Sequence, residues 1–521
     1  MRFSNKNKYL IIIALALGTF LVIIQRFQWV TDYPFSLYWS EGNRLYDYSI
    51  YFMADKYIAN SRPVLPWFSP GRYLTWGILF LLPNTTIWLH RMWTAILGTI
   101  PAFLFGYILS VRLRFPGLTK WIFILWTFLF LSQGPIYCPL IFSACLIVGF
   151  VHERHVVRSM AITMLAGYYA GISRWIWFMA PGIWSFLVLC FETQRNSGEK
   201  NFTRINAAKI GIPLAGFAGG FIAFLQVLFS STGTIQLHQS EPLLWYRLFP
   251  NATYFFGILP GFALTVVPLI AIVGWIFRKT YFPLNKPEQL ILGFVLLCFS
   301  MLGMIVSVKI GCGADLHHFD MAFITFAMIA GYGAKEFIDW QPALVQKLPE
   351  WICIMGILAI LIPVSYAVTR FHRVQVPSFK DAKNAIELIQ GKIEQAQVQG
   401  EVLLMDERQL LTFGYLKNVK LVTDYEKKYL MEKAMGNNGK VFQTFYSDLA
   451  KHRFSLILSE QLSTRIKGRR RRVGEENNAW VKWVAVPLLR YYEPIWTYPN
   501  RGVGLSLQLL APRNKSFKNK E

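Results

Sequence analysis

Two carboxylates follow the first apolar stretch of the chain after a short interval. Glu41 and Asp47 lie in an aromatic-rich segment, YWSEGNRLYDYS, at residues 38–49. A carboxylate at a membrane surface can act as a general base that takes a proton from an acceptor hydroxyl or amine during group transfer. Because the two acids do not share one face of an ideal helix, we expect Glu41 to do this, with aromatic neighbours shielding it and Asp47 supporting it. The alternative is a structural loop in which Arg44 pairs with the acid.

A second group of ionisable residues lies in GCGADLHHFD, residues 311–320, between two apolar stretches. Ionisable side chains this close to a bilayer are candidates for function. They could bind a phosphate or a sugar, or open the next helix as a capped loop. Asp315, His317 and Asp320 are also candidate ligands of a divalent metal, Mg or Mn, although their spacing matches no standard zinc site. The predicted substrate-binding residues of this region are Lys309, Asp315, His317, His318 and Asp320.

Arginines near the same predicted membrane face complete the candidate site. Arg174 stands in GISRWIWF, where two apolar stretches meet, and Arg44 lies between the two carboxylates. A guanidinium group binds phosphate oxygens with two hydrogen bonds, so arginines that converge on one side would suit a lipid-linked phosphate. A single arginine there is otherwise an interfacial anchor. Other polar residues predicted near this face, without an assigned role, are Arg72, His90, Arg91, His238, Glu241 and Arg247.

The composition places these residues in a membrane protein. The chain has 521 residues, of which 54% are hydrophobic and 16% aromatic, and its mean hydropathy is +0.35. These values exclude an ordinary soluble globular protein. We predict a polytopic α-helical membrane protein with about 11 transmembrane helices, the first of them uncleaved. The predicted spans are 9–25, 88–110, 120–133, 135–151, 159–173, 175–191, 207–229, 257–277, 289–308, 320–334 and 351–369.

Basic residues in alternate short loops set the predicted orientation. They place the N-terminus in the cytoplasm, and an odd number of spans then puts residues 371–521 on the opposite side. The predicted domains are a transmembrane domain at 1–370, with a first extracytoplasmic loop at about 25–87, and an extracytoplasmic α/β domain at 371–521. Within the loop, residues 72–83 are too short to span and are predicted to lie at the membrane interface.

Residues 371–521 have the composition of a small soluble α/β domain. A helical period extends over residues 378–400 and ends at a glycine. Short apolar runs at 401–407 and 454–460 predict buried strands. The segments 480–498 and 504–512 look like further strands.

The net charge of +24 is spread over both halves of the chain. In a membrane protein, cytoplasmic loops and attraction to anionic head groups explain such a charge, so we expect membrane lipid and no nucleic acid as a partner. The basic run RIKGRRRRV at 465–473 has two alternatives, contact with lipid phosphates or a solvated loop. The six cysteines form no CxxC pair and are interpreted as small buried hydrophobic residues.

The order of these features resembles that of the GT-C membrane glycosyltransferases, including the protein mannosyltransferase and aminoarabinose transferase relatives. That family often carries Asp-Glu at the start of its first outer loop. Ser40–Glu41 stands at this place here, so Glu41 takes the second acidic position and the first is missing. Either Asp47 substitutes for it or the chain belongs to a divergent branch. GADLHHFD and the tail motifs MDERQLLTFGY, EENNAWVKWV and YYEP resemble uncharacterised bacterial membrane proteins grouped with such enzymes.

The resemblance implies an inverting enzyme of the bacterial plasma membrane that crosses the membrane several times. It would move a sugar from a polyprenyl-phosphate donor to a glycan, lipid or protein acceptor, without a cofactor other than the metal considered above. Alternative functions are a transporter or flippase and a non-catalytic envelope-assembly protein. A transporter predicts inverted repeats and polar residues at the membrane midplane. The ionisable residues of this chain instead cluster at the predicted helix ends.

Overall fold

The computed structural model describes most of the chain. The described residues are 5–53, 56–57, 70–195, 202–230, 241–279, 284–312, 315–340, 348–377, 379–499, 503–504 and 506–513.

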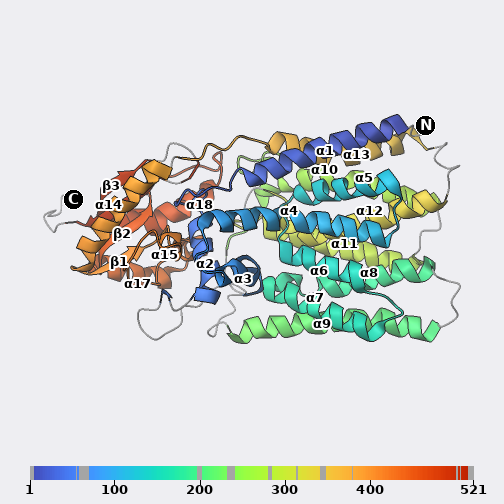
Figure 1. The fold of residues 1–521 in the computed structure, drawn as a ribbon, viewed down its shortest axis with the longest axis horizontal. Coiled ribbons are helices and arrows are strands. Elements are labelled where there is room, and N and C mark those ends of the chain that lie inside the picture. Colours follow the sequence, from blue (N-terminus) through green and yellow to red (C-terminus); the bar gives the residue numbers. More distant parts are fainter. Residues whose placement is uncertain are drawn as a thin grey trace.

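A long helical bundle forms one end of the molecule and a small sheet lies at the other (Figure 1). Each of the eleven stretches expected to span a membrane coincides with one helix of the bundle. These helices are α1 (Asn5–Phe27), α4 (Ile87–Arg112), α5 (Gly117–Ser132), α6 (Cys138–Phe150), α7 (Val156–Ser173), α8 (Ala180–Arg195), α9 (Phe202–Ser230), α10 (Ile258–Lys279), α11 (Lys286–Ser307), α12 (Asp320–Trp340) and α13 (Glu350–Arg370).

Eight segments among the described residues are long and apolar enough to cross a membrane. They are Lys8–Phe27, Ile87–Arg112, Trp175–Glu192, Ala207–Phe229, Ile258–Arg278, Lys286–Ser307, His317–Asp339 and Glu350–Arg370. Two further apolar helices, α5 and α6, are shorter. Helices of this length and composition indicate a membrane protein.

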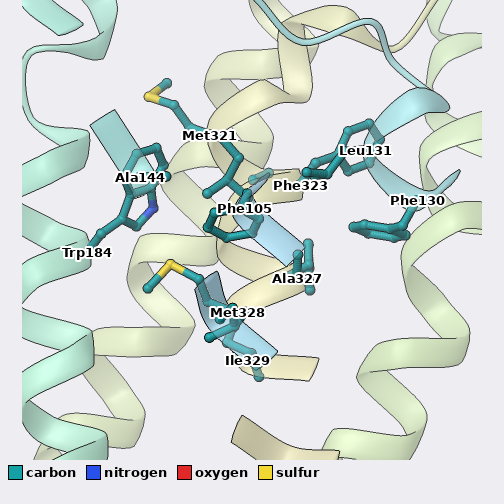
Figure 2. Close-up of a cluster of buried hydrophobic side chains, with 14 of the residues drawn as sticks. Phe105, Phe130, Leu131, Ala144, Trp184, Met321, Phe323, Ala327, Met328 and Ile329 are labelled. Atoms are coloured by element: carbon teal, nitrogen blue, oxygen red, sulfur yellow. The ribbon is translucent and has the colours of Figure 1, made fainter. Parts of the chain in front are cut away.

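Close packing holds the bundle together. Large side chains from α4, α5, α8 and α12 meet at its centre, where Phe105, Trp184 and Phe323 are fully buried (Figure 2). The indole Nε1 of Trp184 donates to Thr325 Oγ1 at 2.9 Å, which satisfies its only polar atom. Glycines bring α7 and α9 into backbone contact, because a Cβ at Gly167 would overlap the backbone of the facing helix.

In the segment between α1 and α4, residues 28–86, the described residues include short helices. Helix α2 (Glu41–Met53) and α3 (Pro70–Gly77) are followed by a short 3-10 helix, η2 (Ile78–Leu81). None of them is among the candidate membrane spans. They lie between the bundle and the sheet (Figure 1). We call residues 28–86 the α1–α4 segment.

The C-terminal module, residues 379–512, contains a four-stranded sheet in the order β1-β2-β4-β3. Strands β1 and β2 are parallel, and the other two pairs are antiparallel. The strands predicted at 401–407, 454–460 and 504–512 are confirmed in position. The elements are α14 (Phe379–Gln397), β1 (Glu401–Leu404), α15 (Gln409–Thr412), α16 (Lys427–Met435), α17 (Gly439–Ala450), β2 (Phe454–Glu460), α18 (Gly474–Trp480), η7 (Val481–Ala485), α19 (Val486–Tyr491), β3 (Tyr492–Tyr498) and β4 (Leu507–Pro512).

The strand expected over residues 480–498 is wrong for its first twelve residues. Residues 474–491 are helical, with one π-helical turn at η7, and only β3 is extended. Trp480, Val484 and Leu488 recur every fourth residue and are all buried. That spacing is the period of a helix, and it outweighs the strand preference of the valines and tryptophans.

The α1–α4 segment completes one face of this sheet. Val402 and Leu404 of β1 point to that face together with the buried side of α14, whereas Leu403 points to the other. Tyr33 and Phe35 of the α1–α4 segment belong to the same hydrophobic cluster as Val402. The core of the C-terminal module is therefore built from two distant parts of the chain.

A pair of adjacent residues on α14 tests this core. Ile389 is fully buried and Leu388 is 38% exposed. Ile389→Ala should weaken the module by about 2–5 kcal/mol, and Leu388→Ala by clearly less, because only the first removes buried methyl groups and leaves a cavity. Hydrogen exchange of β1 and β2 in the full-length protein would measure the difference. Equal effects of the two substitutions would contradict the packing described here.

Candidate functional site

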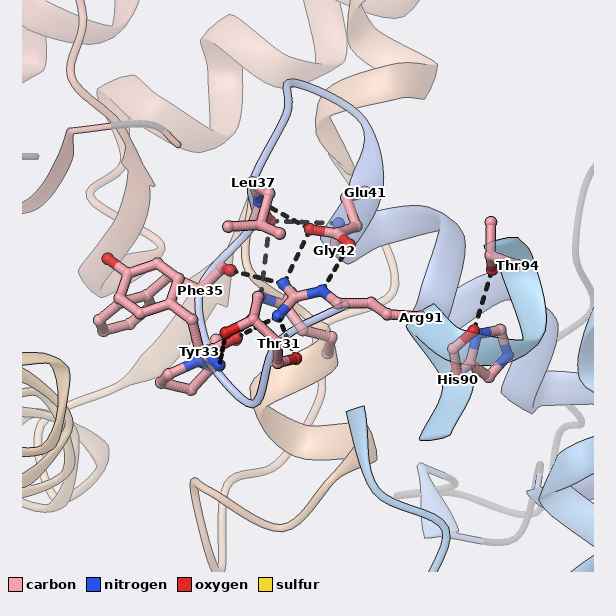
Figure 3. Close-up of polar contacts among 12 residues, drawn as sticks. Thr31, Tyr33, Phe35, Leu37, Glu41, Gly42, His90, Arg91 and Thr94 are labelled. Carbon is pink, nitrogen blue, oxygen red and sulfur yellow. Dashed lines mark hydrogen bonds and ion pairs between the residues drawn. The ribbon is translucent and has the colours of Figure 1, made fainter. Parts of the chain in front are cut away.

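Arg91 and Glu41 form a buried ion pair between α4 and the start of α2 (Figure 3). Arg91 Nε donates to Glu41 Oε1 at 2.8 Å and Nη2 donates to Oε2 at 2.9 Å. The same guanidinium donates to the backbone carbonyls of Thr31, Tyr33 and Phe35, at 3.0, 2.6 and 3.0 Å. All five N–H groups of the Arg91 side chain therefore donate hydrogen bonds to the α1–α4 segment.

Glu41 is held by more than Arg91. Its Oε2 also accepts the backbone N–H of Leu37 at 2.6 Å, and its position as first residue of α2 suits the positive end of that helix. The partner expected from the sequence, Arg44, is not the one observed. Glu41 is thus a well-ordered carboxylate, with Oε1 accepting one hydrogen bond from a described residue. An oxygen of this kind can accept a second hydrogen bond.

A cavity of about 330 Å³ lies beside Glu41, between the end of α1, α2 and α4. This size is in the range of small-ligand sites. Trp29 and Tyr38 supply aromatic faces to this cavity. Its charged lining residues are Glu41, Arg26, Arg44 and Arg91. Arg44 makes no ion pair within the part of the chain that the structure describes. The cavity therefore offers both a carboxylate and a guanidinium to a ligand.

Arg44 lines this cavity and is also near a group of cationic residues around Tyr137. The guanidinium of Arg72 lies 4.0 Å from the centre of the Tyr137 ring, and the Nε atom of Arg72 is buried without a hydrogen-bond partner. The charges of Arg44, Arg72, Arg174 and His317 all act on the Tyr137 hydroxyl. Arg44 lies on α2, Arg72 on α3, Arg174 directly after α7 and His317 directly before α12.

The histidine loop, at residues 311–320, packs against Arg174. The Nη2 atom of Arg174 lies 3.1 Å from His318 Nδ1, and its Nη1 atom lies 3.7 Å from Asp320 Oδ2. Asp320 is fully buried and also accepts the indole N–H of Trp177 at 2.8 Å. His317 is hydrogen bonded to Asp315, and its ring centre is 6.2 Å from that of Tyr137. The loop is therefore part of the same cluster.

The structure brings most of the predicted binding residues together. Arg44, Arg174, Asp315, His317, His318 and Asp320 all belong to the cluster around Tyr137. Lys309 lies at its edge, where it is 3.9 Å from Glu241 and its charge reaches His318. The sequence indicated Arg72 and Arg91 only as polar residues near this face. It contained no signal for Tyr137, an aromatic residue at the edge of an apolar stretch.

The candidate metal ligands do not assemble into a metal site. Among the described residues, no group of three or more His, Cys, Asp or Glu side chains could hold a metal ion. Asp315 pairs with His317, whereas Asp320 faces Arg174 and Trp177. Gly313 and Ala314 of this loop lie outside the described residues.

Asp47 points away from the cavity, into the contact with the C-terminal module. It pairs with Lys428, and nearby Asn43 donates to Glu426 and to the carbonyl of Met405. Burial raises the pKa of Asp47 to about 6, although the charge of Lys428 opposes the shift. Asp47 thus joins α2 to the module and does not line the cavity beside Glu41.

A second acid of this contact is Glu407, which is fully buried. It accepts the backbone N–H of Ser36 at 3.0 Å and the side-chain amide of Gln409. Burial, followed by the charge of Asp406, raises the pKa of Glu407 to about 7. The neighbouring Lys427 pairs with Asp406, so the contact contains both signs of charge.

No protein-family model matches the chain, and no curated protein is significantly similar to it in sequence.

The Arg91–Glu41 pair is expected to be essential for the α1–α4 segment. Arg91→Ala would leave the Glu41 carboxylate buried without its counter-charge and three carbonyls without donors, which should cost about 3–5 kcal/mol. Hydrogen exchange of residues 31–47 would report the loss. The double variant Arg91→Met/Glu41→Gln should lose less than the sum of its single changes, since it leaves no charge unpaired. Strict additivity would show that the two side chains do not interact.

Glu407 should make the contact between segment and module depend on pH. Its pKa in the folded protein is raised to about 7 from an ordinary 4.5, so its stabilising contribution is complete below pH 4.5 and is lost as the pH rises through 7. Glu407→Gln removes this titration and should flatten the profile by about 1–3 kcal/mol between these pH values. The measurement is the opening free energy of residues 31–47, from hydrogen exchange corrected for intrinsic rates. Parallel profiles of variant and wild type would contradict the assignment.

Proposed function

We propose that the protein is an integral membrane glycosyltransferase that uses a polyprenyl-phosphate sugar as donor. The observation that carries the proposal is the cationic cluster around Tyr137. The Arg72 guanidinium lies 4.0 Å and the His317 ring centre 6.2 Å from the centre of its ring, and Arg174 lies 3.1 Å from the neighbouring His318. Guanidinium and imidazolium groups are suited to phosphate oxygens. Their position at the end of an apolar helical bundle favours a phosphate that is attached to a lipid.

The cavity beside the cationic cluster would receive the sugar and the acceptor. Trp29 and Tyr38 line it and offer faces for a sugar ring. The acceptor hydroxyl would donate a hydrogen bond to Glu41 Oε1 and attack the anomeric carbon from the side opposite the phosphate. The bond between that carbon and the phosphate oxygen breaks, and the configuration inverts. The hydroxyl proton passes to Glu41, and the polyprenyl phosphate leaves with the bonding electrons.

The cationic residues would contribute most where the charge develops. The departing phosphate gains negative charge in the transition state. Arg72, held against the Tyr137 ring, and Arg174, held by His318 and Asp320, would stabilise it, together with Arg44. Asp320 would orient Arg174 through their ion pair at 3.7 Å, and Asp315 would orient His317 through their hydrogen bond. Neither acid would contact the donor. Asp47 would act indirectly by fixing α2 against the module.

We further propose that α5, α6 and α7 cross the membrane with the eight candidate spans, which gives eleven. The N-terminus would then lie in the cytoplasm of a bacterium and the C-terminal module would be a soluble domain outside the plasma membrane. The acceptor would be an extracytoplasmic glycan, lipid or protein. A reporter fused after residue 513 should be active only outside the cytoplasm, and cytoplasmic activity would overturn the orientation.

The test of catalysis is sugar transfer in membrane vesicles supplied with polyprenyl-phosphate sugars. Glu41→Gln keeps the shape and an accepting oxygen but removes the proton acceptor, so turnover should fall roughly a hundredfold. Glu387→Gln is the control, because it makes the same change at an exposed glutamate of α14, outside the cavity and the α1–α4 segment, and should change turnover by less than about threefold. Unchanged turnover in a folded Glu41→Gln protein would mean that Glu41 is only structural.

The donor site has a separate test. Arg72→Gln and Arg174→Gln should each weaken binding of a polyprenyl-phosphate donor about tenfold or more, because each removes a charged hydrogen-bond donor. Arg114→Gln, an exposed arginine at the opposite end of the bundle, is the control. A transporter or an assembly protein predicts no transfer with any donor, whatever these substitutions do to binding.

A further inference from the structure

Exposed aromatic side chains surround the point where α10 begins. They belong to residues 245–256, which directly precede the candidate membrane span of α10 in the chain. Trp245 and Phe249 are 53% and 59% exposed, and Phe255 and Phe256 are 81% and 50% exposed. Aromatic rings at the end of a spanning helix lie at the level where the hydrocarbon of a bilayer meets its head groups. In water, a patch of this kind would be unfavourable.

A basic loop of the C-terminal module lies beside these rings. All basic side chains of residues 465–473 are exposed, namely Arg465, Lys467, Arg469, Arg470, Arg471 and Arg472. Arg469 is 3.8 Å from Glu475. Within the described part of the chain, the last three arginines make no ion pair. The loop therefore presents a concentrated positive charge.

Several contacts fix the loop next to the aromatic residues. The guanidinium of Arg469 lies 5.6 Å from the ring centre of Tyr246, and the Val473 N–H donates to Thr253 Oγ1 at 3.1 Å. Below the loop, buried Arg247 pairs with Glu476 of α18 at 2.8 Å. Figure 1 shows α18 on the side of the module that faces the bundle.

The backbone of the loop is also held from within the module. The N–H of Lys467 donates to Asn478 Oδ1 at 2.8 Å, and Asn477 Nδ2 donates to the carbonyl of Arg465 at 3.0 Å. These contacts therefore fix the position of the arginines relative to the start of α10.

We propose that residues 245–256 and 465–473 together form a docking surface for the head groups of anionic phospholipids. The aromatic rings would enter the interfacial layer, and the arginines would bind the phosphates above it. The positive charge of residues 465–473 is complementary to the negative charge of the lipid head groups. The start of α10 sets how deeply the aromatic rings would enter the bilayer. The surface would hold the module against the leaflet in which α10 begins, whatever reaction the protein catalyses.

The experiment compares the full-length protein in nanodiscs of phosphatidylcholine alone and with added phosphatidylglycerol. Hydrogen exchange of residues 465–473 should slow roughly tenfold or more in the anionic discs, since several basic residues contribute. High salt should remove most of this protection, because the Debye length falls to about 3 Å at 1 M. The triple variant Arg470→Gln/Arg471→Gln/Arg472→Gln should lose it at low salt.

A matched triple variant, Lys392→Gln/Lys417→Gln/Lys420→Gln, removes the same charge from exposed positions on and beside α14, on the far side of the module. It should keep the full protection. The proposal is overturned if protection is equal in both kinds of disc, if the two variants lose it equally, or if it requires added polyprenyl phosphate instead of phosphatidylglycerol. Salt dependence in the wild type gives a readout that needs no variant.

Discussion

The five hydrogen bonds of Arg91 are the constraint on which the arrangement of the site depends. Residues 28–40 form neither helix nor strand, yet much of this stretch is buried, so its carbonyl groups need donors from elsewhere. One guanidinium from α4 supplies three of these carbonyls and also neutralises Glu41. Because α4 belongs to the bundle, the pair fixes the start of α2 relative to the bundle. The cavity beside Glu41 exists where it does for this reason.

Helix α2 connects the bundle to the C-terminal module through one charge at its first residue and one near its middle. Glu41 faces Arg91 of the bundle, whereas Asp47 faces Lys428 of the module. A helix repeats every 3.6 residues, so positions six apart point in different directions and can serve two partners. The module cannot be regarded as a separate body, because Tyr33 and Phe35 of the same segment are part of its hydrophobic core. Gly42 allows α2 to approach α15 of the module closely, since a Cβ at this position would overlap Gln409.

The sequence predicted features that depend on local pattern and missed those that depend on distant partners. All eleven apolar stretches are helices, and β1 and β2 lie where short apolar runs indicated them. The helical turns at 480–491 were mistaken for a strand because valine and tryptophan favour strands, although their spacing is helical. The predicted importance of Arg44, Arg174 and His317 rested on their common membrane face, and they do share a cluster. Arg91 lies 50 residues from Glu41, and no local pattern indicates such a pair.

The balance of charge is the physical basis for proposing an anionic ligand at the cluster around Tyr137. Each nearby acid is already engaged: Glu41 by Arg91, Asp47 by Lys428 and Asp315 by His317. Asp320 faces Arg174 alone among the arginines of the cluster, at 3.7 Å. Arg44 and Arg72 are half-buried and form no ion pair with any residue that the structure describes. Positive charge of this kind is costly away from water unless something neutralises it. The phosphate of a lipid-linked donor would supply the negative counter-charge for these two arginines. They lie at an end of the bundle, where a lipid head group could reach them.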